Sequence, residues 1–568
     1  MSSESPSATE DDLAWPPGAC ESTFLLNLQA LAQVDRPLAE RMCWSVIGGN
    51  VVRVDGELTY QAQQSRFPMA IAPEECESLV AAAIAKAAGR PLLAFGLGTG
   101  DLLLCALAAD APVVAWDQDP WLFRLVLGTH DLSGYLLSRK LRLSLGTDLL
   151  ALLDADLVRL EHPLFKRVYS TQGNLPATGL GQRRALLCDG GLFVGSMQRA
   201  LEAQGWSVWT ADVERLSVDE LNLAASAIRP QIIVSINHRA GLSEFASEVG
   251  ARLLVWEIDP TTCLPGAPEG DTDHAWIFSY RESGAQLFRN AGFAHANYLP
   301  LAADTTLRQP ITLSPAERDH YAAPISFVGA SMASSARHNG ARFAALHAAW
   351  QQSAPSALSA DELARLILAD QRQDFAHWRV PDLLTQHAPG FSEWCLGQPA
   401  GEDPAMLIGE LAASEKRLAW ISALARHDIQ VWGDADWQQT STRYRGPATH
   451  HHDLTRIFNA SIINLDIGRI YQPDIVTMRV FDVLACGGFA LVEHSDGIEH
   501  LFDVGRELDT YRDQSELEEK VSWYLSHPEE ARAIGARGRA AVLERHAFAD
   551  RVQTMLAAAG VDSDLLSV

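Results

Sequence analysis

The sequence DIVTMRVFDVLACGGFALV, Asp474–Val492, carries the clearest structural pattern in the chain. It begins on an acid and reaches a second acid, Asp482, after seven intervening residues. The apolar residues around Asp482 follow a helical period, and Gly487 and Gly488 can end that helix in a left-handed turn. An apolar run follows at once and predicts a buried strand. A helix that leads directly into a buried strand is typical of a parallel α/β sheet.

The same alternation of a short apolar run and a helix-period segment repeats along the chain in three sets. The set that includes this stretch has strands predicted at Pro324–Val328, Asp428–Trp432, Ser461–Asp466, Phe489–Glu493 and Glu507–Tyr511. The set before it has Ala185–Cys188, Ser207–Ala211, Gln231–Asn237, Arg252–Glu257, His274–Ser279 and Ala296–Pro300. The first set has Leu92–Gly96, Pro112–Asp117 and Leu141–Leu145, preceded by a looser stretch, Val51–Tyr60, with an Asp-Gly hairpin signal.

These sets predict an α/β protein in which two facing Rossmann-like domains follow a third Rossmann-like domain. Polar, Gly- or Pro-containing stretches at Thr171–Arg184 and Ala302–Pro324 are the expected linkers. The predicted segments are a disordered tail at 1–15, the first domain at 16–175, the second at 181–318, the third at 319–548 with a helical insert near 351–415, and a C-terminal helix and tail at 549–568.

Composition excludes some classes of function. The 568 residues carry a formal net charge of −26, and no run of Lys and Arg offers a basic patch, so nucleic acid is not an expected partner. No apolar stretch approaches the ~20 residues that span a bilayer, and the acidic N-terminal residues do not resemble a secretory signal. The eight cysteines are scattered singly, which favours free thiols and the cytoplasm.

The Asp474–Val492 stretch also suggests chemistry. A carboxylate such as Asp482 can accept hydrogen bonds from a ribose diol, and Arg479, one helical turn earlier, can meet a diphosphate. The alternative is an ion pair between Asp482 and Arg479 on the helix surface.

Two further stretches would add to the same site. PISFVGASMASSARHNGARF places Gly329 after a strand and Arg337 near a helix, an arrangement that could bind a nucleotide diphosphate. The alternative is an ordinary connection between a strand and a helix, with Arg337 in solvent. SIINLDIGRI offers Asn464 as a donor-binding group or as a satisfied core polar group. The triplet His450–His452 lacks partners at metal-ligand spacing, so we expect a polar loop and no metal.

The second set supplies the opposite wall of the expected cleft. Gly190 and Gly191 let the backbone approach a ligand or acceptor. His238 and Asp259 follow strand ends and are the candidate general bases for activating an acceptor. Each also has a simpler explanation, since His238 can be a loop histidine and Asp259 can form a turn before Pro260.

The combined stretches resemble a known family. RVFDVLACGGFALVEHSDGIEHLF resembles the C-terminal half of family-1-type glycosyltransferases of the CgeB-like (spore-maturation-protein) branch, and RPQIIVSINH, ARLLVWEIDP and NYLPLAAD resemble its N-terminal half. The resemblance covers about Ala185 to Val552. The broader family has Glu at both ends of the seven-residue gap, where this chain has Asp474 and Asp482. The resemblance implies the two-domain GT-B fold, a nucleotide-sugar co-substrate and no required cofactor.

The first domain combines two resemblances. Its Gly96, Gly98 and Gly100, followed by Asp117 after the next strand, resemble a methyltransferase site for S-adenosylmethionine, but Ala94 stands where those enzymes usually have an acid. The wider stretch through WLFRLVLGTHDLSGYLLSRKLRLSLG resembles the N-terminal domain of motility-accessory-factor flagellin glycosyltransferases. We therefore expect a methyltransferase-like domain that is degenerate, structural or acceptor-recognising.

Taken together, the residues and the resemblance predict a metal-independent glycosyltransferase that acts on a protein or glycan acceptor, such as flagellin. Two alternatives remain open from the sequence. One is an S-adenosylmethionine-dependent methyltransferase with a sugar-binding C-terminal half, and the other is a non-catalytic module that binds a glycan or a protein.

Overall fold

The computed structural model describes residues 21–43, 51–54, 57–62, 65–152, 155–169, 172, 181–213, 216, 218–259, 270, 272–354, 358–398 and 401–561. The predicted tail at 1–15, the Asp-Gly turn and most of the first predicted linker lie outside these residues. Within the described ranges, every helix is too short or too polar to cross a bilayer.

The C-terminal lobe is built on a six-stranded parallel sheet in the order β16-β15-β14-β17-β18-β19. Numbered along the chain this is 3-2-1-4-5-6, the order of a Rossmann fold. Its strands are β14 (Ala323–Val328), β15 (Ile429–Trp432), β16 (Arg443–Gly446), β17 (Ser461–Asp466), β18 (Ala490–Glu493) and β19 (Asp509–Tyr511). Its helices are α13 (Pro315–Tyr321), α19 (Asp453–Ala460), α20 (Met478–Ala485), α21 (Asp496–Leu501), α22 (Gln514–Ser526) and α23 (Pro528–Arg545).

The middle lobe has a second six-stranded parallel sheet, in the order β13-β12-β11-β10-β8-β9. This is 2-1-3-4-5-6 along the chain, so the doubly wound sheet follows the flavodoxin-like order. Its strands are β8 (Arg184–Cys188), β9 (Ser207–Ala211), β10 (Ile232–Ile236), β11 (Arg252–Glu257), β12 (Ala275–Ser279) and β13 (His295–Tyr298). Its helices are α9 (Val194–Ala203), α10 (Val218–Ile228), α11 (Leu242–Glu248) and α12 (Glu282–Ala291).

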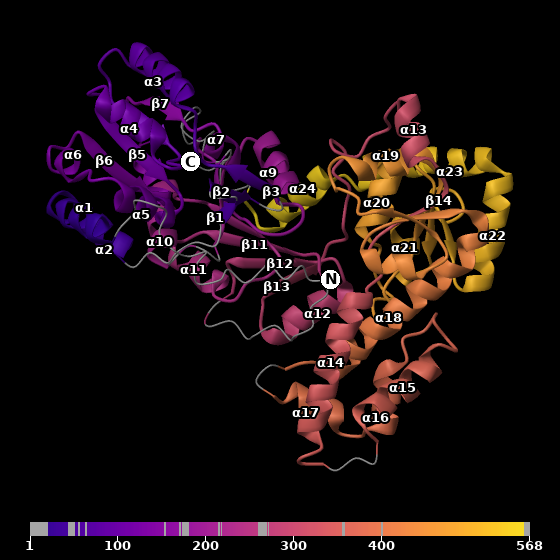
Figure 1. Cartoon of the computed structure of the whole chain (residues 1–568). Helices are drawn as coiled ribbons and strands as arrows, with labels where there is room; N and C mark the ends of the chain where they lie inside the picture. Colours follow the sequence, from indigo (N-terminus) through magenta and orange to yellow (C-terminus); the bar gives the residue numbers. More distant parts are fainter. Residues whose placement is uncertain are drawn as a thin grey trace.

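The N-terminal domain carries a four-stranded parallel sheet in the order β6-β5-β4-β7, and a separate antiparallel sheet of β1, β2 and β3. Its strands are β1 (Val51–Val54), β2 (Glu57–Ala62), β3 (Ser65–Pro68), β4 (Leu92–Phe95), β5 (Val113–Asp117), β6 (Leu141–Leu145) and β7 (Val158–Glu161). Its helices are α1 (Glu21–Val34), α2 (Arg36–Cys43), α3 (Pro73–Ala87), α4 (Asp101–Ala108), α5 (Pro120–Thr129), α6 (Ser133–Leu137) and α7 (Phe165–Val168). Figure 1 shows this domain beside the middle lobe, on the side away from the C-terminal lobe.

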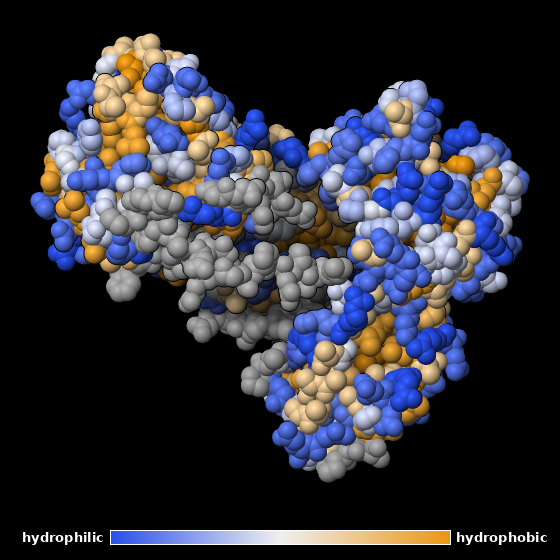
Figure 2. Space-filling model, viewed as in Figure 1, coloured by the Kyte–Doolittle hydropathy of each residue, from blue (hydrophilic) through white to orange (hydrophobic). Residues whose placement is uncertain are grey.

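A helical insert interrupts the C-terminal lobe between β14 and β15. It consists of α14 (Ala333–Trp350), α15 (Ala360–Gln371), α16 (Val380–His387), α17 (Phe391–Leu396) and α18 (Pro404–Ala423). These helices share a hydrophobic core of their own, which includes Phe343, Leu384 and Phe391. Most of the insert extends below the sheet in Figure 1. Hydrophilic residues cover much of the visible C-terminal lobe in Figure 2, as the net charge leads one to expect.

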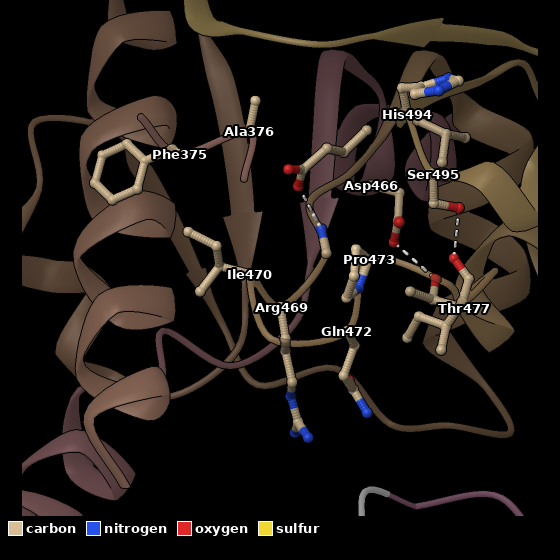
Figure 3. A pocket seen from close by; sticks show the side chains of 14 residues that line it. Phe375, Ala376, Asp466, Arg469, Ile470, Gln472, Pro473, Thr477, His494 and Ser495 are labelled. Carbon is tan, nitrogen blue, oxygen red and sulfur yellow. Dashed lines mark hydrogen bonds between the residues drawn. The ribbon is translucent and has the colours of Figure 1, made fainter. Parts of the chain in front are cut away.

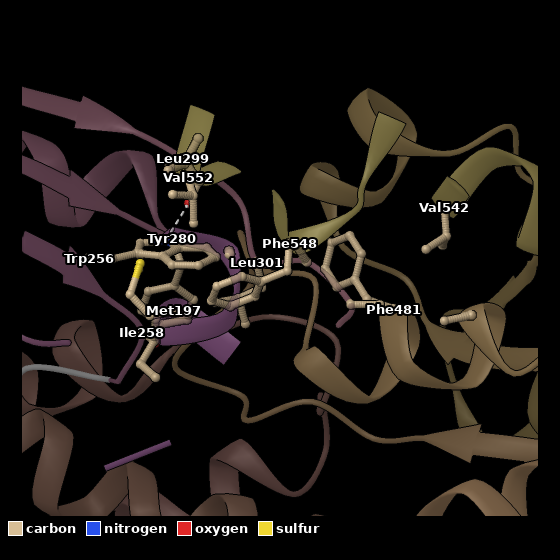
Figure 4. Close-up of a cluster of buried hydrophobic side chains, with 14 of the residues drawn as sticks. Met197, Trp256, Ile258, Tyr280, Leu299, Leu301, Phe481, Val542, Phe548 and Val552 are labelled. Carbon is tan, nitrogen blue, oxygen red and sulfur yellow. Dashed lines mark hydrogen bonds between the residues drawn. The ribbon is translucent and has the colours of Figure 1, made fainter. Parts of the chain in front are cut away.

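The two six-stranded lobes face each other and are joined by the linker before α13 and by α24 (Phe548–Ala558). α24 packs on α9 of the middle lobe, and the Arg551 Nε donates to the Pro300 carbonyl at 2.9 Å. Phe548 lies between the lobes: its ring is 5.2 Å from that of Trp256, and one hydrophobic cluster continues from there to Phe481 (Figure 4). The C-terminal helix therefore crosses back and fixes the middle lobe against the C-terminal lobe.

Candidate functional site

The two switch points of the strand order define where a ligand is expected, because doubly wound sheets bind ligands at the carboxyl ends of the strands where the order reverses. In the C-terminal lobe this point lies between β14 and β17. In the middle lobe it lies between β8 and β10, just before Gly190 and Gly191. Both glycines have a positive backbone φ angle, 103° and 107°, which residues other than glycine rarely adopt.

Arg479 occupies the C-terminal switch point. Its Nε donates to the Val328 carbonyl at 2.6 Å, at the end of β14, and its guanidinium pairs with Asp466, at the end of β17. A Cβ on Gly329 would lie 2.6 Å from the Arg479 guanidinium, so the glycine leaves room for the arginine. The structure thus brings together Gly329 and Arg479, two of the residues that we predict to bind the donor.

A pocket between the lobes, the inner pocket, contains two more of the predicted residues. Asp482 enters it from α20, and Gly191 enters it from the loop before α9. The linker between the lobes forms a third wall. The full lining is Gly191, Leu192, Phe193, Val194, Gly195, Ser196, Arg199, Asp304, Leu307, Arg308, His450, His451 and Asp482.

The partner of Asp482 differs from the one considered from the sequence. The Arg308 Nε donates to the Asp482 Oδ2 at 2.9 Å, whereas Arg479 pairs with Asp466. The Asp482 and Arg308 side chains are only 5% and 1% exposed. Burial raises the pKa of Asp482, and the Arg308 charge opposes that rise. No sequence signal identified Arg308, which lies in the polar linker.

The remaining polar groups of the inner pocket are also held in place. The Arg308 guanidinium lies 3.0 Å from the His450 Nδ1, and burial together with this cation lowers the pKa of His450 to about 4. Arg199 pairs with Asp304 at 2.5 Å. Burial alone would raise the pKa of Asp304, but hydrogen bonds from Thr306 and Arg199 hold it at about 2. At neutral pH the pocket therefore offers paired charges and an uncharged imidazole, which suit a polar ligand with hydroxyl groups.

A second cavity, the outer cavity, lies at the carboxyl ends of β11 and β12. Its lining includes Glu257, Asp259, Tyr280 and Arg281. Glu257 is 6% exposed and is the last residue of β11, and burial raises its pKa to about 7. A carboxylate with such a pKa suits a general base at neutral pH. The sequence prediction missed Glu257, although an acid that ends an otherwise apolar strand is a visible signal.

The two predicted bases lie nearby. Asp259 is exposed in the outer cavity, where its Oδ2 accepts from the Asn237 Nδ2 at 2.8 Å. The His238 ring packs against Phe288 and Phe293, with ring centroids 5.5 and 5.2 Å away, and burial lowers its pKa. His238 is thus a half-buried side chain that packs against two aromatic rings.

Of the five predicted donor-binding residues, only Asp482 lines either of these cavities; Gly329 and Arg479 lie at the switch point, and the other two lie elsewhere. Asn464 is 2% exposed within the sheet, where its Oδ1 accepts from the Ser326 Oγ at 2.8 Å and its Nδ2 donates to the Phe489 carbonyl at 3.3 Å. Its role is that of a satisfied core amide, because all its partners are internal. Arg337 is exposed on α14 and pairs with Asp436 at 3.0 Å.

The glycine-rich loop of the N-terminal domain is filled by the domain's own side chains. A Cβ on Gly96 would lie 2.3 Å from Phe165, and one on Gly98 would lie 2.4 Å from His162. The buried carboxylate of Asp117 accepts from the Leu97 amide at 2.7 Å and from the Tyr169 hydroxyl at 2.8 Å. The groups that would bind a nucleotide cofactor are therefore occupied internally.

This filled loop gives a first prediction. We expect S-adenosylmethionine at 1 mM to leave the thermal unfolding temperature of the full chain unchanged, because Phe165 and His162 fill the space beside the glycines and Tyr169 hydrogen-bonds to the Asp117 carboxylate. A dose-dependent rise in that temperature, absent with adenosine as the control, would contradict this expectation and revive the methyltransferase alternative.

Comparisons with known proteins define the class of the C-terminal lobe. Residues 416–557 match a family model described as "Glycosyl transferase-like", so this part of the chain is glycosyltransferase-like. The matched segment includes β15 to β19, with Arg479 and Asp482. No curated protein matches the chain at a significant level.

Several solved structures show a weak likeness to this chain. HepE from Anabaena, in complex with UDP and glucose, is 12% identical, with 68% of this chain and all of that chain covered at a TM-score of 0.37. Sucrose-phosphate synthase from Thermosynechococcus elongatus is 11% identical, with 68% and 100% covered at 0.40. The β-glucosyltransferase of T4 phage is 9% identical, with 66% and 99% covered at 0.35. At such TM-scores the likeness carries no conclusion about the site.

Proposed function

We propose that this protein is a GT-B glycosyltransferase of the CgeB-like branch, which moves a sugar from a nucleotide-sugar donor to an acceptor. The observation that supports this most is the inner pocket, which both lobes line and which brings Asp482 and Gly191 together. The glycosyltransferase-like segment supplies the Asp482 wall of that pocket.

The donor nucleoside would occupy the inner pocket. The Asp482 carboxylate and the uncharged His450 ring are suited to the ribose hydroxyls and the base. Arg479, at the C-terminal switch point, would meet the diphosphate together with the amides that begin α20. Fixed positive groups aimed at the diphosphate would stabilise the charge that develops as it leaves, so no metal is required in this proposal.

The acceptor would approach from the outer cavity. Glu257 would take the proton of the acceptor hydroxyl. At the same time the acceptor oxygen would form a bond to the anomeric carbon of the donor sugar. The bond from that carbon to the diphosphate breaks, and the nucleoside diphosphate leaves with the electron pair. Asp259 lies beside Glu257 and is the second candidate for this role.

The resemblance of the N-terminal domain supports a protein acceptor such as flagellin, and the scattered cysteines support action in the cytoplasm. Because side chains of the N-terminal domain fill its glycine-rich loop, we assign this domain to acceptor recognition or structural support rather than to cofactor chemistry.

A panel of UDP-, GDP-, CMP- and dTDP-sugars tests the proposed function. We expect one of these donors to stabilise the chain, by about 2.7 kcal/mol at a hundredfold excess over its dissociation constant. Arg479→Gln should weaken binding of that donor about tenfold to a hundredfold, since it removes a charged hydrogen-bond donor. Calorimetry measures both effects.

The matched control is Arg372→Gln, which removes an exposed arginine that pairs with Glu415 on the insert. It should bind the donor as the unchanged protein does. If no nucleotide sugar binds, or if Arg479→Gln binds the donor undiminished, the proposed donor site is wrong.

A further inference from the structure

The loop after β17 carries an arginine that the mechanism above does not use. Arg469 is partly buried, and within the described part of the chain it forms no ion pair with a carboxylate. Four other arginines at or near the lobe interface pair with carboxylates, namely Arg199–Asp304, Arg281–Asp474, Arg308–Asp482 and Arg479–Asp466. Among the described residues, Arg469 differs from these four arginines in having no carboxylate partner.

The acid whose charge acts on Arg469 is Glu410, and it is engaged elsewhere. The Tyr471 hydroxyl donates to the Glu410 Oε1, and the Ser335 Oγ donates to the Glu410 Oε2 at 2.8 Å. No contact within 4.0 Å joins Glu410 to Arg469 as an ion pair. The Arg469 guanidinium hydrogen-bonds to Tyr471 but has no carboxylate partner among the described residues, so it can still pair with an acidic group of a ligand.

Buried groups fix the backbone just before Arg469. The Gly468 amide donates to the Glu493 Oε2 at 2.9 Å, and Lys416 pairs with the other oxygen of Glu493 at 2.6 Å. Arg417 donates to the Ile467 carbonyl at 3.0 Å. Burying charged groups in this way costs free energy. We expect this cost to be offset by function, because the buried pairs hold the loop that carries Arg469 in one conformation.

The direction of Arg469 follows from its neighbour Gln472. In Figure 3 the two side chains point the same way, away from Phe375 and His494. The Gln472 Nε2 donates to the Tyr280 hydroxyl of the middle lobe at 2.5 Å, and Tyr280 lines the outer cavity with Glu257. Arg469 is therefore aimed at the side of the interface where the acceptor would enter.

From these contacts we infer that the outer cavity, together with Arg469, binds a substrate that carries an acidic group, a carboxylate or a phosphate. A guanidinium binds either group through two parallel hydrogen bonds. Because the chain carries a net charge of −26, an anionic substrate needs such a local cation to approach. This inference rests on the proposed function, since it names the substrate class of that site.

Three sugars of similar size test the inference, namely glucose, glucuronate and glucose 6-phosphate, titrated by calorimetry into the full chain. We expect both charged sugars to bind at least tenfold tighter than glucose. Arg469→Gln should abolish that preference, and the control Arg372→Gln should retain it. The comparison of glucuronate with glucose 6-phosphate shows which acidic group the site prefers.

Equal affinity for the three sugars, or a preference that survives Arg469→Gln, would overturn the inference. A tenfold loss of UDP affinity in Arg469→Gln, with the sugar preference unchanged, would assign Arg469 to the donor and would also overturn it. Failure of the proposed function looks different, because then no nucleotide sugar binds or turns over even though the charged sugars are preferred.

Discussion

Replacing Glu257 with Gln is expected to lower kcat by about 10²–10⁴-fold, the contribution typical of a positioned general base. Glutamine keeps the acceptor for the His238 amide but cannot take a proton. Burial raises the pKa of Glu257 to about 7, so the carboxylate is ionised and active above this pH and protonated below it. Activity of the unchanged protein should therefore fall as the pH drops below about 7, and the residual activity of the variant should lack this step. Steady-state rates between pH 5 and 9 measure both.

Two variants make this test specific. Glu282→Gln removes an exposed carboxylate at the start of α12, with 69% of its side chain exposed, and should leave kcat and its pH dependence unchanged. Asp259→Asn separates the two candidates in the outer cavity. If Asp259→Asn removes the activity and Glu257→Gln does not, Asp259 is the base and our assignment of Glu257 is wrong.

Asp482→Ala is expected to lower the free energy of unfolding by about 3–5 kcal/mol, because it leaves the charge of Arg308 buried without its partner. The sequence alone did not predict this loss of stability, because it did not identify Arg308 as the partner of Asp482. The side chains are 174 positions apart and join the interlobe linker to α20, so the loss should affect the coupling between the lobes. Denaturant titration followed by tryptophan fluorescence measures it.

The double variant Arg308→Met with Asp482→Leu provides the control. It removes both charges and retains apolar volume, so it should recover most of the lost stability. If Asp482→Ala unfolds at the same denaturant concentration as the unchanged protein, the buried pair does not stabilise the interface, and Asp482 is free to serve the donor alone.

The sequence predicted the strands that are buried on both faces. Arg252–Glu257 and Ser461–Asp466 have the predicted bounds, because central parallel strands read as short, largely apolar runs. The edge strand Ser207–Ala211 also has the predicted bounds, because four of its five residues are buried. Three strands were missed: β3, which follows the predicted stretch Val51–Tyr60, and the partly exposed strands β16 and β7. β16, with the sequence RYRG, lies at the edge of its sheet with no fully buried residue, and β7 alternates between buried and partly exposed positions.

The site was predictable where the topology alone brings residues together. Gly329 and Arg479 meet at the switch point of one sheet, and Gly191 and Asp482 line one pocket because the two lobes face each other. The Arg308–Asp482 pair was not predictable, since it depends on where a polar linker folds back. The sequence could not decide between the two interpretations of Asn464, because an amide near a strand end looks the same in sequence whether it faces a cleft or a neighbouring strand. The pKa of Glu257 depends on burial, which only the packing of the lobes determines.

Amide hydrogen exchange with and without a saturating nucleotide sugar tests most directly whether the cleft between the lobes binds the donor. We expect slower exchange in three segments that are far apart in sequence, 191–196, 304–308 and 477–482, because they line the inner pocket or lead into it. Two results would contradict this expectation. One is slower exchange confined to the glycine-rich loop at 96–100, and the other is unchanged exchange in all three segments despite measurable binding.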